Sequence, residues 1–455
     1  MLRYKKGAVS ADGQKVSVTY RDFRVFGDIG RETLRGMDSM NCDLRDGILK
    51  TGLGVLPYTL KDGSNPSFAS LTSRVDGLFS IDVMSSPSAA VYDEDLFLVT
   101  EDGKLWAFSG TSFLGGALVG AGVSAATAVD KSSGKQRTIF AGSNRSFLAF
   151  DGVVQGIALP NTTAAICTWN NRIFIGTKVF KVAYSASEMA FTFASETIDD
   201  SGTLYLPSDR GDVVALRTFQ GRVYVFCERG IFRLKADGAA RDFQLTAIEY
   251  GGGKIFGKTV GNCGDVIFFL AQDGLYRMRG DVVKRVCKHL PIRPKESGEF
   301  CNHGVSGDDF LVRYLEASGK RRTLVVDSEG KDGYFTSYFE GLGEHNGKTL
   351  CRYLDTVGMI SPNGVLPTNG TYYFLSEKVD FGSRDRKTLT GLQFKGAGSF
   401  VCEVLADGKF YSQSLSFVNG TTVFDKPLRG KEFQFRFVLS KGTFIHSVTA
   451  EAVVL

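Results

Sequence analysis

The sequence predicts an all-β protein: a β-propeller of six or seven blades, with seven preferred, followed by a C-terminal antiparallel β-sandwich. Three observations lead to this fold class. The 455 residues include 54 Gly, 36 Phe and 16 Tyr but only 10 Pro; aromatic residues favour half-buried strands, and Gly supplies the positive-φ positions of tight turns. An apolar strand unit recurs through the middle of the chain. From about residue 371 the pattern changes to alternating apolar and polar residues.

The recurring unit is a polar turn, a short apolar strand, a second turn and an apolar-aromatic strand. One copy spans residues 95–108 around the turn Glu101-Asp-Gly, and another spans residues 265–278 around Gln272-Asp-Gly. The first apolar strands of successive copies are 34 to 50 residues apart, at Leu96, Ile139, Ile173, Val223, Val266, Phe310 and Leu350. This is the period of a four-stranded propeller blade. A single four-stranded meander cannot cover its own two apolar faces, so the units are expected to stand side by side in a ring.

These patterns divide the chain into three parts. Residues 81–370 form the expected propeller, and residues 1–80 form an N-terminal arm that supplies ring-closing strands, with residues 78–82 as the candidate. Residues 371–455 contain alternating stretches such as 399–405, 432–438 and 445–454, separated by Gly- or Asn-rich turns. Period-2 alternation is typical of an antiparallel sandwich with one buried face per sheet.

Composition and charge exclude several classes of function. The net charge of +5 is small for this length and gives only mild cationic character, unlike that of a dedicated nucleic-acid binder. No window of 18 apolar residues suggests a membrane span, and the basic start at residues 1–6 lacks the apolar core of a signal peptide. The eight Cys residues are scattered, which favours free thiols in a reducing cytoplasm.

The search for catalytic chemistry predicts no catalytic residue and no cofactor. A Gly-x-Ser-x-Gly elbow and the glycine motifs of nucleotide-binding sites are absent, and only four His are available for a triad. Carboxylates such as Asp93, Asp95 and Asp102 fall in turns, where Asp commonly caps its own backbone.

Two local clusters are weighed as sites. Two Cys-x-His pairs could supply a tetrahedral zinc site, but their spacing matches no common zinc finger, so ordinary packing is favoured: Cys287, His289, Cys301 and His303. A basic stretch beside them is either a solvated blade edge, which is favoured, or a patch that faces phosphate or an acidic partner: Lys284, Arg285, Lys288, Arg293 and Lys295.

Several stretches resemble the tail-nozzle and packaged-DNA-stabilisation proteins of short-tailed phages. The N-terminal likeness lies in residues 36–55, and the chain end at residues 453–455 is similar too. The stronger likeness is an ordered series over about 100 residues: 184–187, 205–216, 219–226, 230–234, 251–257 and 266–276. These are patterns of turn and strand residues, so they indicate family and fold better than any reactive site.

The resemblance implies a non-catalytic virion protein of the tail, assembled in the host bacterial cytoplasm. In this family copies form a ring, often a hexamer, around the DNA exit channel, which implies contacts with the adaptor, the portal or other tail proteins and transient contact with passing DNA. Two alternatives remain open: a baseplate or receptor-binding propeller that recognises a host-surface glycan, and a propeller glycosidase.

Overall fold

The computed structural model describes residues 2–10, 13–20, 23, 38–69, 71–86, 91–109, 112–120, 123–130, 135–143, 146–150, 153–156, 162–178, 180–187, 193, 200–336, 339–345, 348–366, 370–412 and 421–454. Within this part of the chain the regular structure is β-strand together with three short 3₁₀ turns: η2 (Ser208–Arg210), η3 (Ala240–Asp242) and η4 (Gly257–Thr259). The same residues contain no helix with the length and apolar character needed to cross a membrane.

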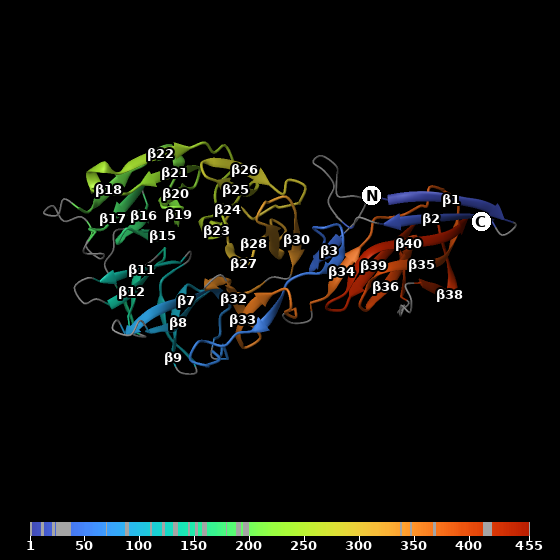
Figure 1. The fold of residues 1–455 in the computed structure, drawn as a ribbon, viewed down its shortest axis with the longest axis horizontal. Helices are drawn as coiled ribbons and strands as arrows, with labels where there is room; N and C mark the ends of the chain where they lie inside the picture. The colour runs from blue at the N-terminus through green and yellow to red at the C-terminus, as the bar shows by residue number, and fades with distance from the viewer. Residues whose placement is uncertain are drawn as a thin grey trace.

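Seven four-stranded antiparallel sheets form a β-propeller (Figure 1). Blade 1 contains β7 (Val75–Ser86), β8 (Val91–Thr100), β9 (Lys104–Ser109) and β10 (Ser112–Leu118). Blade 2 contains β11 (Ser124–Asp130), β12 (Lys135–Ala141), β13 (Ser146–Phe150) and β14 (Val153–Gly156). Blade 3 contains β15 (Thr162–Trp169), β16 (Arg172–Thr177), β17 (Lys181–Tyr184) and β18 (Gly202–Tyr205). Blade 4 contains β19 (Val213–Phe219), β20 (Arg222–Cys227), β21 (Gly230–Lys235) and β22 (Gln244–Ile248). Blade 5 contains β23 (Gly261–Cys263), β24 (Val266–Ala271), β25 (Gly274–Arg279) and β26 (Val282–Val286). Blade 6 contains β27 (Asn302–Ser306), β28 (Asp309–Leu315), β29 (Arg321–Asp327) and β30 (Gly333–Thr336).

Blade 7 closes the ring with a strand from the N-terminal side of the propeller. Its strands are β31 (Gly343–His345), β32 (Lys348–Tyr353), β33 (Thr356–Ser361) and β6 (Gly54–Pro57). In the β6–β33 register Val55 lies opposite Ile360, while β31 packs against β7 of blade 1. Closure by an N-terminal strand was expected. The candidate at residues 78–82 does help to complete a blade, as part of β7, the innermost strand of blade 1, but the strand that closes the ring in blade 7 is β6.

Turn residues determine the hairpins within a blade, and apolar strand residues determine how neighbouring blades pack. Asn170 and Asn171, which join β15 to β16 as a two-residue turn, both have positive φ, as a type I′ hairpin requires. Every residue of β24 is buried because this strand has a neighbouring blade on each side. Across the seam between blades 5 and 6, Phe268 stacks on Phe310 with ring centroids 4.9 Å apart. Mutual burial of aromatic side chains therefore joins successive blades.

A second unit packs two sheets face to face and draws strands from both chain ends (Figure 1). The seven-stranded sheet contains β1 (Leu2–Ser10), β2 (Gly13–Tyr20), β4 (Cys42–Asp43), β5 (Leu49–Thr51), β35 (Lys387–Ala397), β38 (Thr421–Gly430) and β40 (Phe444–Val454). The five-stranded sheet contains β3 (Asp38–Met40), β34 (Tyr372–Leu375), β36 (Phe400–Ala406), β37 (Lys409–Ser412) and β39 (Phe433–Leu439). One buried core lies between the sheets, with Val18 and Val448 from the first and Phe374 and Phe435 from the second.

This arrangement changes the expected division of the chain. The N-terminal arm is not a separate part, because β2 pairs with β40 over residues 14–20, and β1 extends the same sheet. Strands β3 to β5 also join the sandwich, whereas β6 belongs to the propeller. The period-2 pattern identified β40 as a strand, but a pairing between the two ends of the chain has no local signal.

All eight cysteines are buried free thiols. Burial raises the pKa of Cys167 and Cys263 to about 12, so neither forms thiolate readily at neutral pH. We expect the native protein to react with a thiol reagent at most slowly, and the unfolded protein to titrate eight thiols at once. A colorimetric thiol assay with and without guanidinium checks this; a fast native reaction of several thiols would contradict the buried placement.

Candidate functional site

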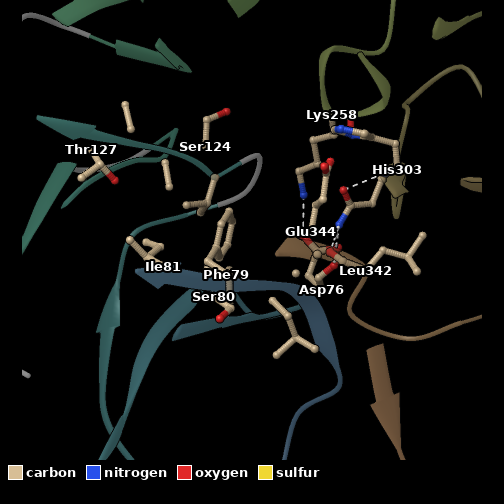
Figure 2. A pocket seen from close by; sticks show the side chains of 18 of the residues that line it. Asp76, Phe79, Ser80, Ile81, Ser124, Thr127, Lys258, His303, Leu342 and Glu344 are labelled. Carbon is tan, nitrogen blue, oxygen red and sulfur yellow. Dashed lines mark hydrogen bonds and ion pairs between the residues drawn. The ribbon is translucent and has the colours of Figure 1, made fainter. Parts of the chain in front are cut away.

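A cavity of about 310 Å³ lies on the propeller axis. Its lining comes from the innermost strands β7, β11, β19, β27 and β31 and from η4, so five blades and one connecting turn contribute to it. One wall carries Phe79, Ile81, Ser124 and Thr127, and the facing wall carries charged side chains (Figure 2). This volume is at the lower end of the range for small-molecule sites in proteins.

Asp76, at the start of β7, joins blade 1 to other parts of the ring at the edge of this cavity. Its carboxylate forms ion pairs with Lys258 of η4 and with Arg313 of β28, whose Nη2 donates to Asp76 Oδ1 at 2.9 Å. The same Nη2 donates to the Asp76 carbonyl at 2.6 Å, and Asn302 Nδ2 donates to it at 3.1 Å. Asn302 Nδ2 also reaches the Leu342 carbonyl at 2.9 Å. Asp76 thus ties blade 1 to the η4 turn between blades 4 and 5 and to blade 6, and Asn302 extends the contact to the loop before blade 7.

The electrostatic environment keeps Asp76 ionised. Burial opposes ionisation, but the charges of Lys258 and Arg313 and their hydrogen bonds outweigh it and hold the pKa of Asp76 below its ordinary value. Arg313 itself is fully buried. A carboxylate held ionised by two cations is a poor proton donor at neutral pH, which makes Asp76 a structural group rather than a general acid.

His303, on β27, lines the same cavity as a neutral ring. Its Nδ1 lies 2.6 Å from the Lys258 carbonyl oxygen, so the neutral tautomer donates Nδ1–H to that oxygen, and the ring stacks on Phe310. Burial first, and then the positive charge of Arg217, lower the pKa of His303 from 6.5 to about 3. The imidazole is therefore uncharged throughout the physiological range.

His303 should make folding stability depend on pH. In the unfolded chain its pKa is 6.5 and in the folded chain about 3, so between these values only the unfolded state takes up the proton. Stability from this group is complete above pH 6.5 and is lost as the pH falls, by about 2 kcal/mol between pH 7 and pH 5. Urea unfolding at both pH values, compared with His303→Asn, measures it; equal pH slopes in the two proteins would contradict it. His446→Asn, on an exposed histidine, is the matched control.

Arg217 and Glu344 complete the charged wall. Arg217, on β19, donates from Nε to the Val260 carbonyl at 2.8 Å and from Nη1 to the Leu216 carbonyl at 3.0 Å. Burial lowers the pKa of Arg217, with Cys167 and Glu344 opposing that change. Burial also raises the pKa of Glu344, with Arg217 opposing it. Neither side chain forms an ion pair with another described residue. Among the described residues, no carboxylate in direct contact with Arg217 neutralises its charge.

The structure separates the four zinc candidates. Cys287 and Cys301 are buried in the core between blades 5 and 6, where Cys287 Sγ donates to the Gly330 carbonyl at 3.5 Å. His289 Nε2 lies 3.2 Å from Asp332 Oδ1, and His303 faces the axial cavity. In the described ranges no group of three or more His, Cys, Asp or Glu side chains is placed to hold a metal.

The basic stretch lies on the outer edge of blade 5 and the loop that follows it. All five side chains are exposed: Lys284, Arg285, Lys288, Arg293 and Lys295. Lys295 Nζ pairs with Glu299 at 2.9 Å, which reduces its availability to a partner. The other four form no ion pair with a described residue, so they leave a modest positive charge on the rim.

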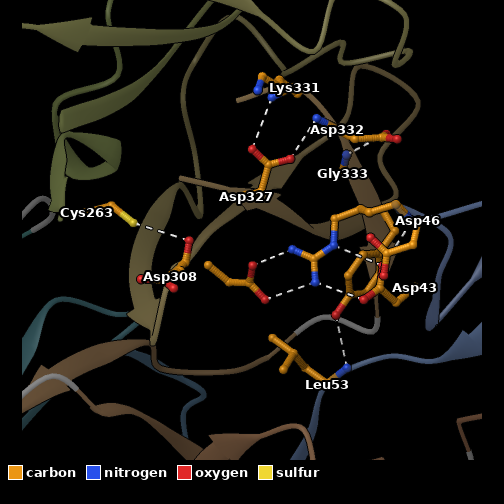
Figure 3. Close-up of polar contacts among 12 residues, drawn as sticks. Asp43, Asp46, Leu53, Cys263, Asp308, Asp327, Lys331, Asp332 and Gly333 are labelled. Atoms are coloured by element: carbon orange, nitrogen blue, oxygen red, sulfur yellow. Dashed lines mark hydrogen bonds and ion pairs between the residues drawn. The ribbon is translucent and has the colours of Figure 1, made fainter. Parts of the chain in front are cut away.

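A second polar centre joins the propeller to the sandwich. Arg45, which follows β4, forms ion pairs with Asp43 at 2.9 Å and with Asp309 at the start of β28, and its guanidinium lies 5.2 Å from the centroid of the Tyr334 ring. The Tyr334 hydroxyl accepts a hydrogen bond from Leu53 N at 3.1 Å (Figure 3). A cavity of about 440 Å³ beside this centre is lined by charged residues from both units: Asp43, Arg45, Asp46, Lys50, Asp327, Lys331 and Asp332.

Backbone and side-chain contacts next to Arg45 make the junction continuous. Asn41 N donates to the Phe335 carbonyl at 2.9 Å, and Thr336 Oγ1 lies 3.0 Å from Asn41 Oδ1. Asn41 and Thr336 are both buried. The two units therefore meet through a desolvated interface, in addition to the chain segments that connect them.

Most residues of the axial cavity were not found from the sequence. Asp76, Arg217, Lys258 and Glu344 belong to four different parts of the chain, and none lies in a motif with a chemical signature. His303 was singled out, but for its spacing from Cys301. The signal that could have found them is their position in the blade. The first strand of each propeller blade faces the axis, so a charged residue in that strand is a candidate for an axial site.

Comparisons with known proteins leave the family open. No family model matches the chain, and no curated protein matches it. A chain in the crystal structure of BBS1N in complex with ARL6DN is 9% identical with a TM-score of 0.42, over 70% of this chain and 98% of that chain. The computationally designed Ika8 protein is 10% identical with a TM-score of 0.36, over 65% of this chain and 98% of that chain. Likenesses at this level carry no argument, and the propeller assignment rests on the seven sheets themselves.

Proposed function

We propose that this chain is a non-catalytic structural protein of a phage tail, a subunit of a ring at the tail nozzle or the head–tail junction. The proposal starts from the resemblance of the strand and turn series in residues 184–276 to tail-nozzle proteins. Copies of the chain would surround the DNA exit path and would contact the adaptor, the portal or other tail proteins.

The observation that carries the proposal is the junction between the two units. Arg45 bridges Asp43 of the sandwich and Asp309 of the propeller, and the buried pair Asn41 and Thr336 lies beside it. Removing either partner of such a desolvated contact is costly, so the contact resists hinge motion. A wall that must withstand DNA passage needs subunits of fixed shape, and a stiff two-unit body suits that task.

The axial cavity bears on where DNA would pass. Lys258, Asp76 and Arg313 form a continuous ionic contact at its edge, and about 310 Å³ is far too small for a nucleic-acid duplex. The DNA path is therefore expected between copies and not through a propeller. The exposed rim residues Lys284, Arg285, Lys288 and Arg293 would give only a weak attraction for phosphate, which allows DNA to slide.

Deleting the gene from the phage genome tests the proposal. We expect particles that package DNA but lose it, or that lack the distal part of the tail, with infectivity restored when the chain is supplied in trans. Particles that keep their DNA but no longer adsorb to cells would instead favour a receptor-binding propeller. Fully infectious particles would contradict a structural role in the virion.

A further inference from the structure

The axial cavity has a cationic wall that faces an apolar wall. Arg217 offers five N–H donors, of which Nε and Nη1 use one each on the Val260 and Leu216 carbonyls, and Nη2 donates to no described residue. The remaining donors belong to a side chain that lines the cavity. A guanidinium with free donors in a concave site is suited to bidentate recognition of an anionic group.

The balance of charges around the cavity is positive. Lys258 and Arg313 together exceed the single charge of Asp76 that they hold, and the Glu344 carboxylate interacts with Arg217 at longer range. With every group ionised, these five side chains carry a net charge of about +1, and any proton taken up by Glu344 makes it more positive. An anion entering the cavity therefore meets an attractive field.

The facing wall selects for more than charge. Phe79 and Ile81 come from β7, and Figure 2 shows them across the cavity from Lys258 and His303, with Ser124 and Thr127 beside them. An aromatic ring and aliphatic groups pack against the apolar face of a ring-shaped ligand, while two hydroxyls can hydrogen-bond its polar substituents. The volume of about 310 Å³ accommodates a single ring and not a chain of them.

From these features we infer that the axial cavity is a binding site for a small carboxylated ring compound, of about the size of one sugar acid. The carboxylate binds Arg217, and the ring lies against Phe79. Glu344 repels the anion and limits its affinity. The site goes beyond the structural role proposed above and does not depend on it, because its residues lie on the propeller axis, away from the junction with the sandwich.

Calorimetric titration of the full chain at low salt tests the site. The probes are glucuronate, N-acetylneuraminate and benzoate, with glucose as the uncharged ring, acetate as the charge without a ring, and glucose 6-phosphate as the phosphate arm. We expect saturable binding of at least one carboxylated ring, at least tenfold tighter than glucose or acetate. Tighter binding of glucose 6-phosphate than of every carboxylate, or no saturable heat with any carboxylated ring, would overturn the inference.

Two substitutions with opposite expected effects assign the site. Arg217→Gln should weaken binding at least tenfold, and Glu344→Gln, which removes the repelling carboxylate, should strengthen it several-fold. Arg285→Gln, on the exposed edge of β26, is the matched control and should leave affinity unchanged. Circular dichroism melts establish that each variant folds; should Arg217→Gln fail to fold, Glu344→Gln decides. Unchanged or weaker binding by Glu344→Gln would contradict the placement of the anion in this cavity.

Discussion

Asp76→Ala should destabilise the propeller by about 3–5 kcal/mol, the cost of leaving a buried charge without its partner. Arg313 is fully buried, and its Nη2 contacts Asp76 Oδ1 at 2.9 Å. Water cannot reach the Arg313 guanidinium to replace that carboxylate, and Lys258 would lose its ion pair as well. The loss should fall on blades 1 and 6 and on the η4 turn between blades 4 and 5, because Asp76 joins them.

Urea unfolding followed by tryptophan fluorescence and by far-UV circular dichroism measures the effect, with both probes needed because a two-unit chain can unfold in steps. Lys295→Ala is the matched control: it breaks the exposed pair with Glu299 and should cost less than about 1 kcal/mol. If Asp76→Ala unfolds at the same urea concentration as the wild type, the ionic contact at the axis does not hold the ring together.

Val55→Asp should open the ring, with a loss of about 4 kcal/mol or more. Val55 is fully buried in β6, the strand that completes blade 7, and it lies opposite Ile360. A carboxylate there would be desolvated inside an apolar cluster that includes Leu311 and Tyr334. Because β6 is the fourth strand of its blade, its release exposes the β33 edge and opens the packed seam between blades 6 and 7.

Hydrogen exchange resolved by segment measures ring opening directly. Amides of residues 343–361 should lose protection first, while those of the sandwich keep theirs. Val282→Asp is the matched control, since Val282 is 57% exposed on β26 and the same substitution should change stability by less than about 0.5 kcal/mol. Unchanged protection of blade 7 in Val55→Asp would show that β6 is not needed for closure.

The propeller was predictable because its signal is local and repeated. Each of the seven aligned apolar positions, from Leu96 to Leu350, lies in the second strand of a blade, which is buried between neighbours: β8, β12, β16, β20, β24, β28 and β32. A short apolar run bounded by turn residues is sufficient to mark such a strand. Repetition made even the weak copies at Phe310 and Leu350 recognisable.

The parts that were missed depend on contacts between distant segments. Strand β6 is four residues long and has no period-2 alternation, so only its pairing with β33 identifies it. The pairing of β2 with β40 joins the two ends of the chain and has no expression in local sequence. Sequence patterns predict which segments are strands, whereas the partner of an edge strand is decided by tertiary packing.

Of the axial-cavity residues discussed above, the sequence pattern singled out only His303. His303 drew attention through the Cys-x-His spacing; in the structure its Nδ1 contacts the Lys258 carbonyl and its ring stacks on Phe310. Asp76 precedes Gly77 and reads locally as a turn. Its role appears only when the ring brings η4 and β28 to the start of β7, because ring closure determines which inner-strand residues face one another.

Cryo-electron microscopy of intact particles from cells that carry the gene tests the proposed role most directly. We expect several copies of the chain around the tail axis, each resolved as a seven-bladed disc fixed to a β-sandwich, with DNA density between the copies and none along a propeller axis. A complete tail map in which every density belongs to other proteins would contradict a place for this chain in the virion.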